Sequence, residues 1–152
     1  MEKERKKIFR KTIQRNNRLK AIVLDTNILI DNVHGFVPWV DSLQKREHEY
    51  RLILPTIVVA EYLTARQVET TEGYERSKRY LSLFEKMDLT VEIAEILGQI
   101  LRRKTYSQGA NTADLIIAST AIYLDGELAT NNRADFAKIP DLRLFDPKKL
   151  KN

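Results

Sequence analysis

Four acidic side chains in this sequence stand where an α/β fold can bring carboxylates together. Asp25 directly follows a short apolar run, and Glu61 lies within the apolar helical pattern PTIVVAEYL. Asp114 and Asp135 each stand near the start of a predicted helix. A carboxylate buried without a partner costs several kcal/mol or more, and four of them at one edge of a sheet would repel one another strongly. Their placement therefore points to a cation and to metal-assisted chemistry.

Each acid also has an ordinary structural interpretation, and for Asp25 it is a turn that compensates the carboxylate after the strand. Glu61 could form a structural ion pair, but no base lies three or four residues away on the same helix. The pattern Asn-x-x-Asp occurs twice and resembles a capping box, with Asn111 or Asn132 at the N-cap and Asp114 or Asp135 at N3. An acid in the first helical turn also suits the helix dipole. Taken singly, these two acids are helix caps; taken together with the other acids, they favour a site.

Composition limits the possible classes of protein. At 152 residues, with 43% hydrophobic and 31% charged residues, the chain predicts one domain with one core. The absence of cysteine excludes disulfides, thiolate zinc sites and cysteine nucleophiles. His34 and His48 lack metal-ligand spacing and are expected at the surface. The longest apolar run, LIIASTAIYL, is far shorter than a membrane span, and the first residues lack the apolar region of a signal peptide. We therefore expect a soluble, cytoplasmic protein without a membrane partner.

The positive charge of the chain belongs to its first 20 residues. The net charge is +5, but residues 1–20 hold nine Lys or Arg against two Glu, which leaves residues 21–152 with 17 bases and 19 acids. We therefore divide the chain into a basic N-terminal arm, residues 1–20, and a domain, residues 21–152. The arm either neutralises phosphates of a nucleic acid or is a solvated, partly helical extension.

Past the arm, short apolar runs alternate with helical patterns. Helical spacing of apolar residues predicts helices at 56–68, with Thr56 as N-cap, at 72–87 and at 91–104, and a further helix that opens at Asp114. This alternation predicts a three-layer α/β/α fold with a mostly parallel central sheet, whose site lies beyond the carboxyl ends of the strands. The predicted strands cover residues 21–25, 51–54, about 88–91, 127–130 and 142–145.

Two other classes of protein place an acid at the end of the first strand. A phosphoaspartyl phosphatase requires Asp-x-Asp there, whereas Asn27 stands at the second position of this chain. A receiver domain requires an adjacent pair of acids ahead of its phosphorylated Asp, and no two consecutive acids stand at the predicted strand ends. Neither class fits.

The segments VLDTNILID, PTIVVAEYL and TADLIIASTAIYLDGELATNNRADF resemble the PIN-domain nucleases, specifically the toxin half of VapBC-type toxin-antitoxin modules. The resemblance covers about residues 21–147. Within the family's Thr-x-Asn-x-x-Asp-Phe element, either the Asn or the Asp would complete the metal site. The residues assigned by resemblance are Asp25, Glu61, Asp114, Thr130, Asn132 and Asp135.

The resemblance implies a metal-dependent endoribonuclease that leaves a 3′-hydroxyl and a 5′-phosphate. A site with oxygen ligands only and no histidine pair selects Mg²⁺ or Mn²⁺ over zinc. One ion, or two, would hold a water and counter charge on the scissile phosphate. Thr26 and Thr130 would orient the carboxylates or bind water. Asn27 is expected to form a local Asx-turn.

The same resemblance implies partners besides RNA. VapC-like proteins form homodimers and bind an antitoxin segment in a groove, often with a basic side chain reaching the acids. In this chain, the segment from Tyr62 to Phe84 carries many large apolar side chains that could line such a groove. The alternative to the enzyme is a non-catalytic PIN-like RNA-binding or scaffold module whose acids no longer bind metal. DNA in place of RNA also remains open as the substrate.

Overall fold

A computed structural model describes residues 19–150, and the arm predicted at residues 1–20 therefore lies almost wholly outside the described residues. Five strands form one sheet in the order β3-β2-β1-β4-β5, and every neighbouring pair is parallel. The strand order reverses beside β1, at the centre of the sheet. The strands are β1 (Lys20–Leu24), β2 (Tyr50–Pro55), β3 (Glu85–Met87), β4 (Glu127–Ala129) and β5 (Arg143–Leu144).

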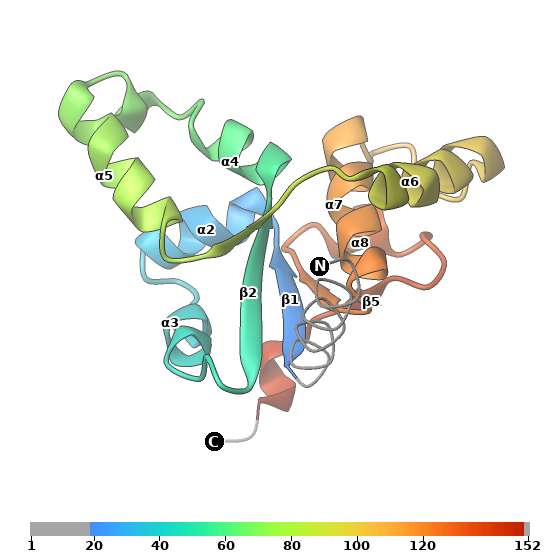
Figure 1. Ribbon diagram of the computed structural model, residues 1–152, viewed down its shortest axis with the longest axis horizontal. Helices are drawn as coiled ribbons and strands as arrows, with labels where there is room; N and C mark the ends of the chain where they lie inside the picture. Colours follow the sequence, from blue (N-terminus) through green and yellow to red (C-terminus); the bar gives the residue numbers. More distant parts are fainter. Residues whose placement is uncertain (1–18, 151–152) are drawn as a thin grey trace, which may run out of the picture.

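Helices cover the sheet in two groups, as Figure 1 shows: α2 to α5 lie on one side of the strands, and α6 to α8 lie on the other. The predicted three-layer α/β/α fold is thereby confirmed. The helices are α2 (Thr26–Val33), α3 (Trp39–Gln44), α4 (Thr56–Tyr62), α5 (Thr71–Leu81), α6 (Val91–Arg103), α7 (Thr112–Tyr123) and α8 (Arg133–Phe136), with 3₁₀ turns at Arg66–Val68 and Pro147–Lys149.

The central strand explains why the acids after it lie at a buried edge. Four successive residues of β1, from Ala21 to Leu24, are buried, because β2 and β4 flank the strand and helices cover both of its faces. The backbone N–H of Asp25 still donates to the carbonyl of Ala129 at 3.0 Å, so the pairing of β1 with β4 continues to the first acid. Asp25 is thus held in line with the strand.

Local capping patterns determine where several helices begin. Thr90 accepts from the N–H of Ile93 at the start of α6, and Asn111 forms a complete capping box with Asp114 at the start of α7. The capping box predicted at Asn132 is wrong: its side chain makes no capping bond, and the N–H of Asp135 bonds to the Asn132 carbonyl. Thr56 is the first residue of α4 rather than its N-cap.

Two predicted helices end earlier than their apolar patterns suggest. The helix predicted at 56–68 ends at Tyr62, where the Thr64 hydroxyl donates to the Glu61 carbonyl at 2.7 Å. The helix predicted at 72–87 ends at Leu81, because the Lys86 ammonium donates to the carbonyls of Leu81 and Phe84 and closes the helix end. As a result β3 forms at Glu85–Met87 instead of at about 88–91.

The large apolar side chains of the segment from Tyr62 to Phe84 differ in burial, and Leu63 and Tyr80 are half-buried against the core. Tyr62, Leu81 and Phe84 are buried in the core, so the expectation that they line an open groove is wrong. Tyr74 and Leu83 remain exposed. His34 and His48 both lie at the surface, as predicted, and none of the described helices is long and apolar enough to cross a membrane.

Candidate active site

Asp25 is the buried centre of the acidic site. Only 5% of its surface is exposed, at the carboxyl end of the central strand. Its Oδ1 accepts the backbone N–H of Thr26 at 2.7 Å, and its Oδ2 accepts the Thr130 hydroxyl at 2.7 Å and the Asn27 side-chain amide at 3.0 Å. These neutral donors replace part of the hydration that burial removes. They hold the carboxyl group in one orientation and add no positive charge beside it.

The electrostatic surroundings of Asp25 identify which other acids lie near it. Burial raises the pKa of the Asp25 carboxyl, and the nearby charges of Asp114 and Glu61 raise it further. The hydrogen bonds from Thr130 and from the Thr26 backbone lower that pKa in part. The arrangement therefore disfavours the ionised form of Asp25 until positive charge enters the site.

Glu61 comes to this edge on α4, the helix that follows β2. Its Oε2 accepts the Thr26 hydroxyl at 2.5 Å. Because Thr26 also donates its backbone N–H to Asp25, this one residue links two of the predicted site carboxylates. The side chain of Glu61 is half-buried. It can be so without a base on its own helix, because the Thr26 hydroxyl donates to it.

Asp114 lies in the first turn of α7, which packs against β1 and α4. Its Oδ2 accepts the backbone N–H of Asn111 at 2.9 Å, and its own N–H donates to the Asn111 side chain at 2.9 Å. Both interpretations of this acid therefore hold at once: Asp114 caps its helix and also lies close enough to raise the pKa of Asp25.

The loop after β4 is tied to Asp25 by a chain of hydrogen bonds. Thr130 donates its hydroxyl to Asp25 and accepts the backbone N–H of Asn132 at 3.0 Å. Asn27 donates to Asp25 and accepts the backbone N–H of Asn131 at 3.1 Å. The predicted local Asx-turn at Asn27 is therefore wrong, because this side chain bridges two loops that are more than 100 residues apart in the sequence.

Asp135 is placed differently from the other predicted acids. It lies in α8, and its carboxylate faces the loop between α6 and α7: a Cβ added at Gly109 would lie 2.5 Å from its Oδ1. Its backbone carbonyl accepts the Ser107 hydroxyl at 3.0 Å. The carboxylates that raise the pKa of Asp25 are those of Asp114 and Glu61. Asp135 thus contacts the loop between α6 and α7.

No three acidic or histidine side chains within residues 19–150 are close enough together, as placed, to hold one metal ion. The donor set nevertheless suits a hard cation, since Asp25, Glu61 and Asp114 offer carboxylate oxygens only. Within residues 19–150, the hydrogen-bond donors to Asp25 are all neutral. To bind an ion beside Asp25, the side chains of Glu61 and Asp114 would have to move closer to Asp25.

Three contacts of the site could not be predicted from the sequence: those of Asn27, Ser107 and Gly109. Each depends on a partner at least 26 residues away or on another loop, so local spacing cannot show it. For Gly109 a weak signal exists, because it lies in the short polar segment that precedes the Asn111 cap.

A parallel sheet in the order 3-2-1-4-5 with acids beyond its carboxyl edge is an open α/β architecture, in which ligands bind beyond the carboxyl ends of the strands. The sequence profile of the PIN domain matches residues 22–142, and the chain therefore belongs to the PIN-domain family. Its relatives include VapC proteins. Ribonuclease VapC2 of Rickettsia felis is 28% identical over 128 residues, which cover 80% of this chain and 94% of that protein.

A second curated relative matches over a shorter stretch. Ribonuclease VapC19 of Mycobacterium tuberculosis is 39% identical over 56 residues, which span 36% of this chain and 45% of that protein. The match thus spans less than half the length of this relative.

Solved structures of the same fold include a toxin-antitoxin complex from Klebsiella pneumoniae, which matches with a TM-score of 0.63 at 27% identity and covers 85% of this chain and 99% of that chain. The structure of VapBC2 from Rickettsia felis, bound to a DNA fragment from its promoter, matches with a TM-score of 0.67 at 26% identity and covers 82% of this chain and 97% of that chain. FitAcB from Neisseria gonorrhoeae matches with a TM-score of 0.67 at 28% identity, and the match covers 85% of this chain and 99% of that chain.

Proposed function

We propose that this protein is a Mg²⁺- or Mn²⁺-dependent endoribonuclease and the toxin of a toxin-antitoxin pair. One observation carries the enzymatic half: Asp25 is buried beyond the central strand, its hydrogen-bond donors in the described part of the chain are neutral, and Glu61 and Asp114 lie near enough to raise its pKa. A scaffold that had lost metal binding would gain stability by replacing such an acid. The PIN family and the VapC relatives support the reaction.

Asp25, Glu61 and Asp114 would hold the metal ion, and Asp135 or Asn132 would complete the site. When bound, the ion would supply Lewis-acid chemistry, activating a water and countering charge on the scissile phosphate. The chain's own residues orient the carboxylates. Thr130, Asn27 and the Thr26 backbone fix Asp25, the Thr26 hydroxyl fixes one oxygen of Glu61, and the Asn111 backbone fixes one oxygen of Asp114.

The test is cleavage of a mixed pool of short RNAs by the full chain in Mg²⁺, in Mn²⁺ and in EDTA, with Asp25→Asn as the matched inactive variant. We expect cleavage in either metal and none in EDTA or from the variant. Ends bearing 5′-phosphate and 3′-hydroxyl are expected. Single-stranded DNA of the same sequences forms a second arm. Cleavage of DNA alone would overturn the choice of RNA, and binding of RNA without cleavage would favour the scaffold module.

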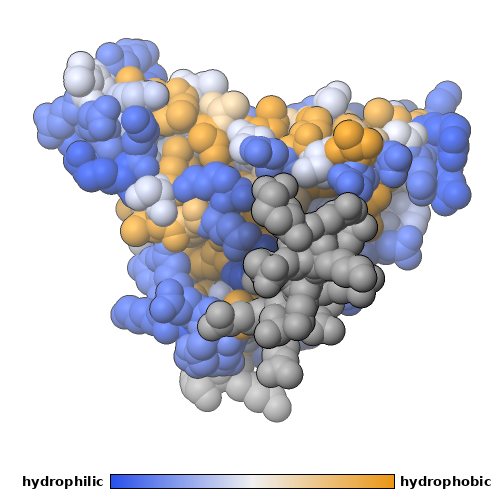
Figure 2. Space-filling model, in the orientation of Figure 1, coloured by the Kyte–Doolittle hydropathy of each residue, from blue (hydrophilic) through white to orange (hydrophobic). Residues whose placement is uncertain are grey.

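The antitoxin half of the proposal rests on the relatives, among them a toxin-antitoxin complex from Klebsiella pneumoniae at 27% identity. Figure 2 shows apolar residues gathered along the upper edge, between hydrophilic residues at its two far ends. On the segment from Tyr62 to Phe84, Leu83 is 64% exposed and Tyr74 is exposed as well. We expect an amphipathic antitoxin helix to dock on exposed side chains of this kind rather than on the buried Leu81.

The native protein should therefore copurify with a small partner, and Leu83→Asp should weaken that complex without unfolding the chain. Leu81→Asp is unsuitable as a test, because Leu81 belongs to the core. If the native protein bound no small partner and cleaved RNA without regulation, the toxin assignment would be wrong and the nuclease assignment would stand.

The homodimer part of the proposal has a candidate surface on α6. Val91, Ala94, Gly98 and Leu101 repeat at helical spacing and are all exposed, with Val91 exposed by 73%. A Cβ at Gly98 would meet nothing within 4 Å, so another backbone can approach closely there. Acids stand in the first half of the helix and bases at its end. Two copies of α6 crossing antiparallel at Gly98 would bring the acids of each copy to the bases of the other.

Sedimentation of the full chain, with charge-reversal variants at exposed positions of α6, tests this antiparallel dimer. Glu95→Arg and Arg102→Glu should each weaken the dimer about tenfold, about 1.4 kcal/mol. The double variant should recover most of the loss, because each acid again faces a base. Failure of the double variant to recover would exclude the antiparallel arrangement.

A further inference from the structure

The loop between α6 and α7 is docked on α8 by two contacts with a single residue. The hydroxyl of Ser107 donates to the backbone carbonyl of Asp135 at 3.0 Å. The carboxylate of the same Asp135 lies against Gly109, where an added Cβ would come within 2.5 Å of Oδ1 and 3.3 Å of Cγ. Real Cβ atoms do not approach other atoms so closely, and Gly109 therefore leaves the space that this carboxylate occupies.

The need for glycine at position 109 comes from this neighbour and not from the backbone. Gly35 is the glycine with a positive φ in the described chain, at 78°, and Gly109 has an ordinary backbone conformation. An alanine at 109 would be compatible with the local backbone but would collide with the Asp135 side chain. The loop and the acid are therefore fitted to each other.

From this docked loop the chain leads directly into Asp114. The backbone N–H of Ala110 donates to the carbonyl of Ser107 at 3.2 Å, which closes a turn after the first contact. Asn111 follows and forms both bonds of the capping box with Asp114. A displacement of the loop on α8 would thus move the residue that orients the Asp114 carboxylate.

We propose that Asp135 is a positioning residue: through Ser107 and Gly109 it holds the loop that sets Asn111 and Asp114 beside Asp25. This inference rests on the proposed function, and it decides between the two candidates for the last position of the site. Asn132 is linked to Asp25 through Thr130: the backbone N–H of Asn132 donates to the hydroxyl of Thr130, which in turn donates to Asp25.

A double-variant cycle separates this role from direct metal binding. Gly109→Ala should weaken Mn²⁺ binding to the full chain, measured by calorimetry without RNA, and lower kcat for RNA about tenfold with little change in KM. Adding Asp135→Ala removes the side chain that the new methyl group meets. The double variant should therefore bind Mn²⁺ more tightly than Gly109→Ala alone. A metal ligand would give the opposite result, since its removal can only weaken binding further.

Ser107→Ala tests the hydroxyl contact with Asp135 by a gentler change, in case Gly109→Ala fails to fold. Its matched control is Ser82→Ala, because the Ser82 hydroxyl, at the end of α5, also donates to a backbone carbonyl, that of Arg79. Ser107→Ala should weaken Mn²⁺ binding severalfold, and Ser82→Ala should leave both Mn²⁺ binding and cleavage unchanged.

Asp135→Asn supplies the last arm, because it keeps the shape of the side chain and removes its charge. We expect Mn²⁺ affinity to fall by no more than about threefold, whereas loss of a ligand costs far more than the 10- to 100-fold typical of outer residues. Loss of Mn²⁺ binding by Asp135→Asn as severe as by Asp114→Asn would overturn the inference. If the unmodified chain neither bound Mn²⁺ nor cleaved RNA, the proposed function itself would fail.

Discussion

Among the described residues, charged side chains are paired at the amino edge of the central sheet but not at its carboxyl edge. At the amino edge, opposite charges pair: Arg143 and Asp125 lie 2.8 Å apart, and the Arg51 guanidinium binds Glu85 through two nitrogens. At the carboxyl edge, the ion pairs found within the described chain do not include Asp25, Glu61, Asp114 or Asp135. Hydroxyl, amide and backbone N–H donors bind the carboxylates of Asp25, Glu61 and Asp114 there instead.

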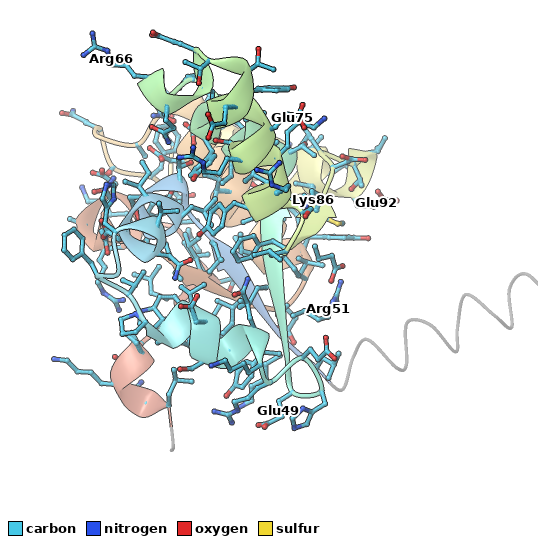
Figure 3. The ribbon with its side chains drawn as sticks, turned by 90° about the vertical axis from the view of Figure 1, so that its left-hand side faces the viewer. Glu49, Arg51, Arg66, Glu75, Lys86 and Glu92 are labelled. Carbon is cyan, nitrogen blue, oxygen red and sulfur yellow. The ribbon has the colours of Figure 1, made fainter. Side chains whose placement is uncertain are left out.

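This difference shows where a cation is needed. The amino edge carries a hollow of about 920 Å³, whose charges largely compensate one another. Its lining holds four bases and three acids: Lys20, Arg51, Arg143, Lys149, Asp125, Glu127 and Asp146. In Figure 3, Glu49 and Arg51 lie at the amino end of β2, and Arg66 lies at the opposite end of the molecule, pointing away from it. A concave surface alone does not identify a site; uncompensated charge does so more directly.

The largest expected effect comes from removing a carboxylate at the carboxyl edge. Asp114→Asn and Glu61→Gln should each lower kcat for RNA by about two orders of magnitude or more, equivalent to about 2.7 kcal/mol, because each removes an oxygen charge from the proposed metal site. The matched control at the other edge is Asp125→Asn, which is exposed and paired with Arg143. It should stay within about twofold of the unmodified chain.

Equal losses from Asp114→Asn and Asp125→Asn would remove the contrast between the edges. The same variants should be compared in Mg²⁺ and Mn²⁺, because a softer ion can partly compensate a weakened oxygen ligand.

The next largest effect concerns Thr130, which donates to the buried Asp25 and accepts from the Asn132 backbone. Thr130→Val keeps the shape but leaves Asp25 short of one donor. The free energy of unfolding should fall by about 1–3 kcal/mol, and Mg²⁺ affinity by about 10- to 100-fold. Thr71→Val, at an exposed position in the first turn of α5, is the control. Denaturant unfolding in EDTA and calorimetry with Mg²⁺ measure the two quantities.

The sequence predicts the parts of this site that local patterns determine. The run before Asp25 and the Asn111 capping box depend on neighbours within a few residues, and both occur as predicted. The strand at 88–91 is misplaced, because a lysine that closes α5 shifts the chain into the sheet three residues earlier than the apolar pattern suggests.

The parts that could not be predicted depend on contacts between distant segments. The sequence predicts a local turn at Asn27, yet the side-chain oxygen of Asn27 accepts the backbone N–H of Asn131, 104 residues further along the chain. Whether Asp135 faces the acids or the loop depends on Gly109, and spacing within the Asn-x-x-Asp pattern is the same in both cases. Periodicity shows which face of an element is buried, but it does not show which loop packs against which.

A third prediction uses the raised pKa of Asp25. Since the folded chain holds this proton more tightly than the unfolded chain, whose carboxyl titrates near 3.8, the folded state binds more protons between the two pKa values. Stability therefore falls as pH rises through the folded pKa, and the full penalty applies above it. Without metal, the stability of Asp25→Asn relative to the unmodified chain should increase from about pH 4 to about pH 7.

The measurement is urea unfolding of both proteins in EDTA at several pH values across that range. Excess Mg²⁺ should cancel the trend in the unmodified chain, because binding to the folded state alone stabilises it by about 2.7 kcal/mol at 100 times Kd. A stability difference that did not change with pH would mean that Asp25 carries no penalty when ionised.

A smaller effect is expected from the basic arm, which leads into β1 at the amino edge. Seven of its bases could contact phosphates, and each lost contact removes about 0.7 from the slope of log K against log salt for single-stranded RNA. Deleting residues 1–18 should flatten this slope and leave cleavage at low salt intact. An unchanged slope would leave the arm as a solvated extension. The seven bases are Lys3, Arg5, Lys6, Lys7, Arg10, Lys11 and Arg15.

The smallest effect is expected at the amino edge itself. Arg143 donates to the Asp125 carboxylate at 2.8 Å and to its backbone carbonyl, but both side chains are largely exposed. Exposed pairs of this kind are screened by water and salt, so Arg143→Ala should change the free energy of unfolding by less than about 1 kcal/mol. Cleavage should be unchanged, because β4 separates this pair from Thr130 and the acids. A large loss of activity in Arg143→Ala would show that the hollow at this edge takes part in function, and the contrast between the two edges would no longer locate the site.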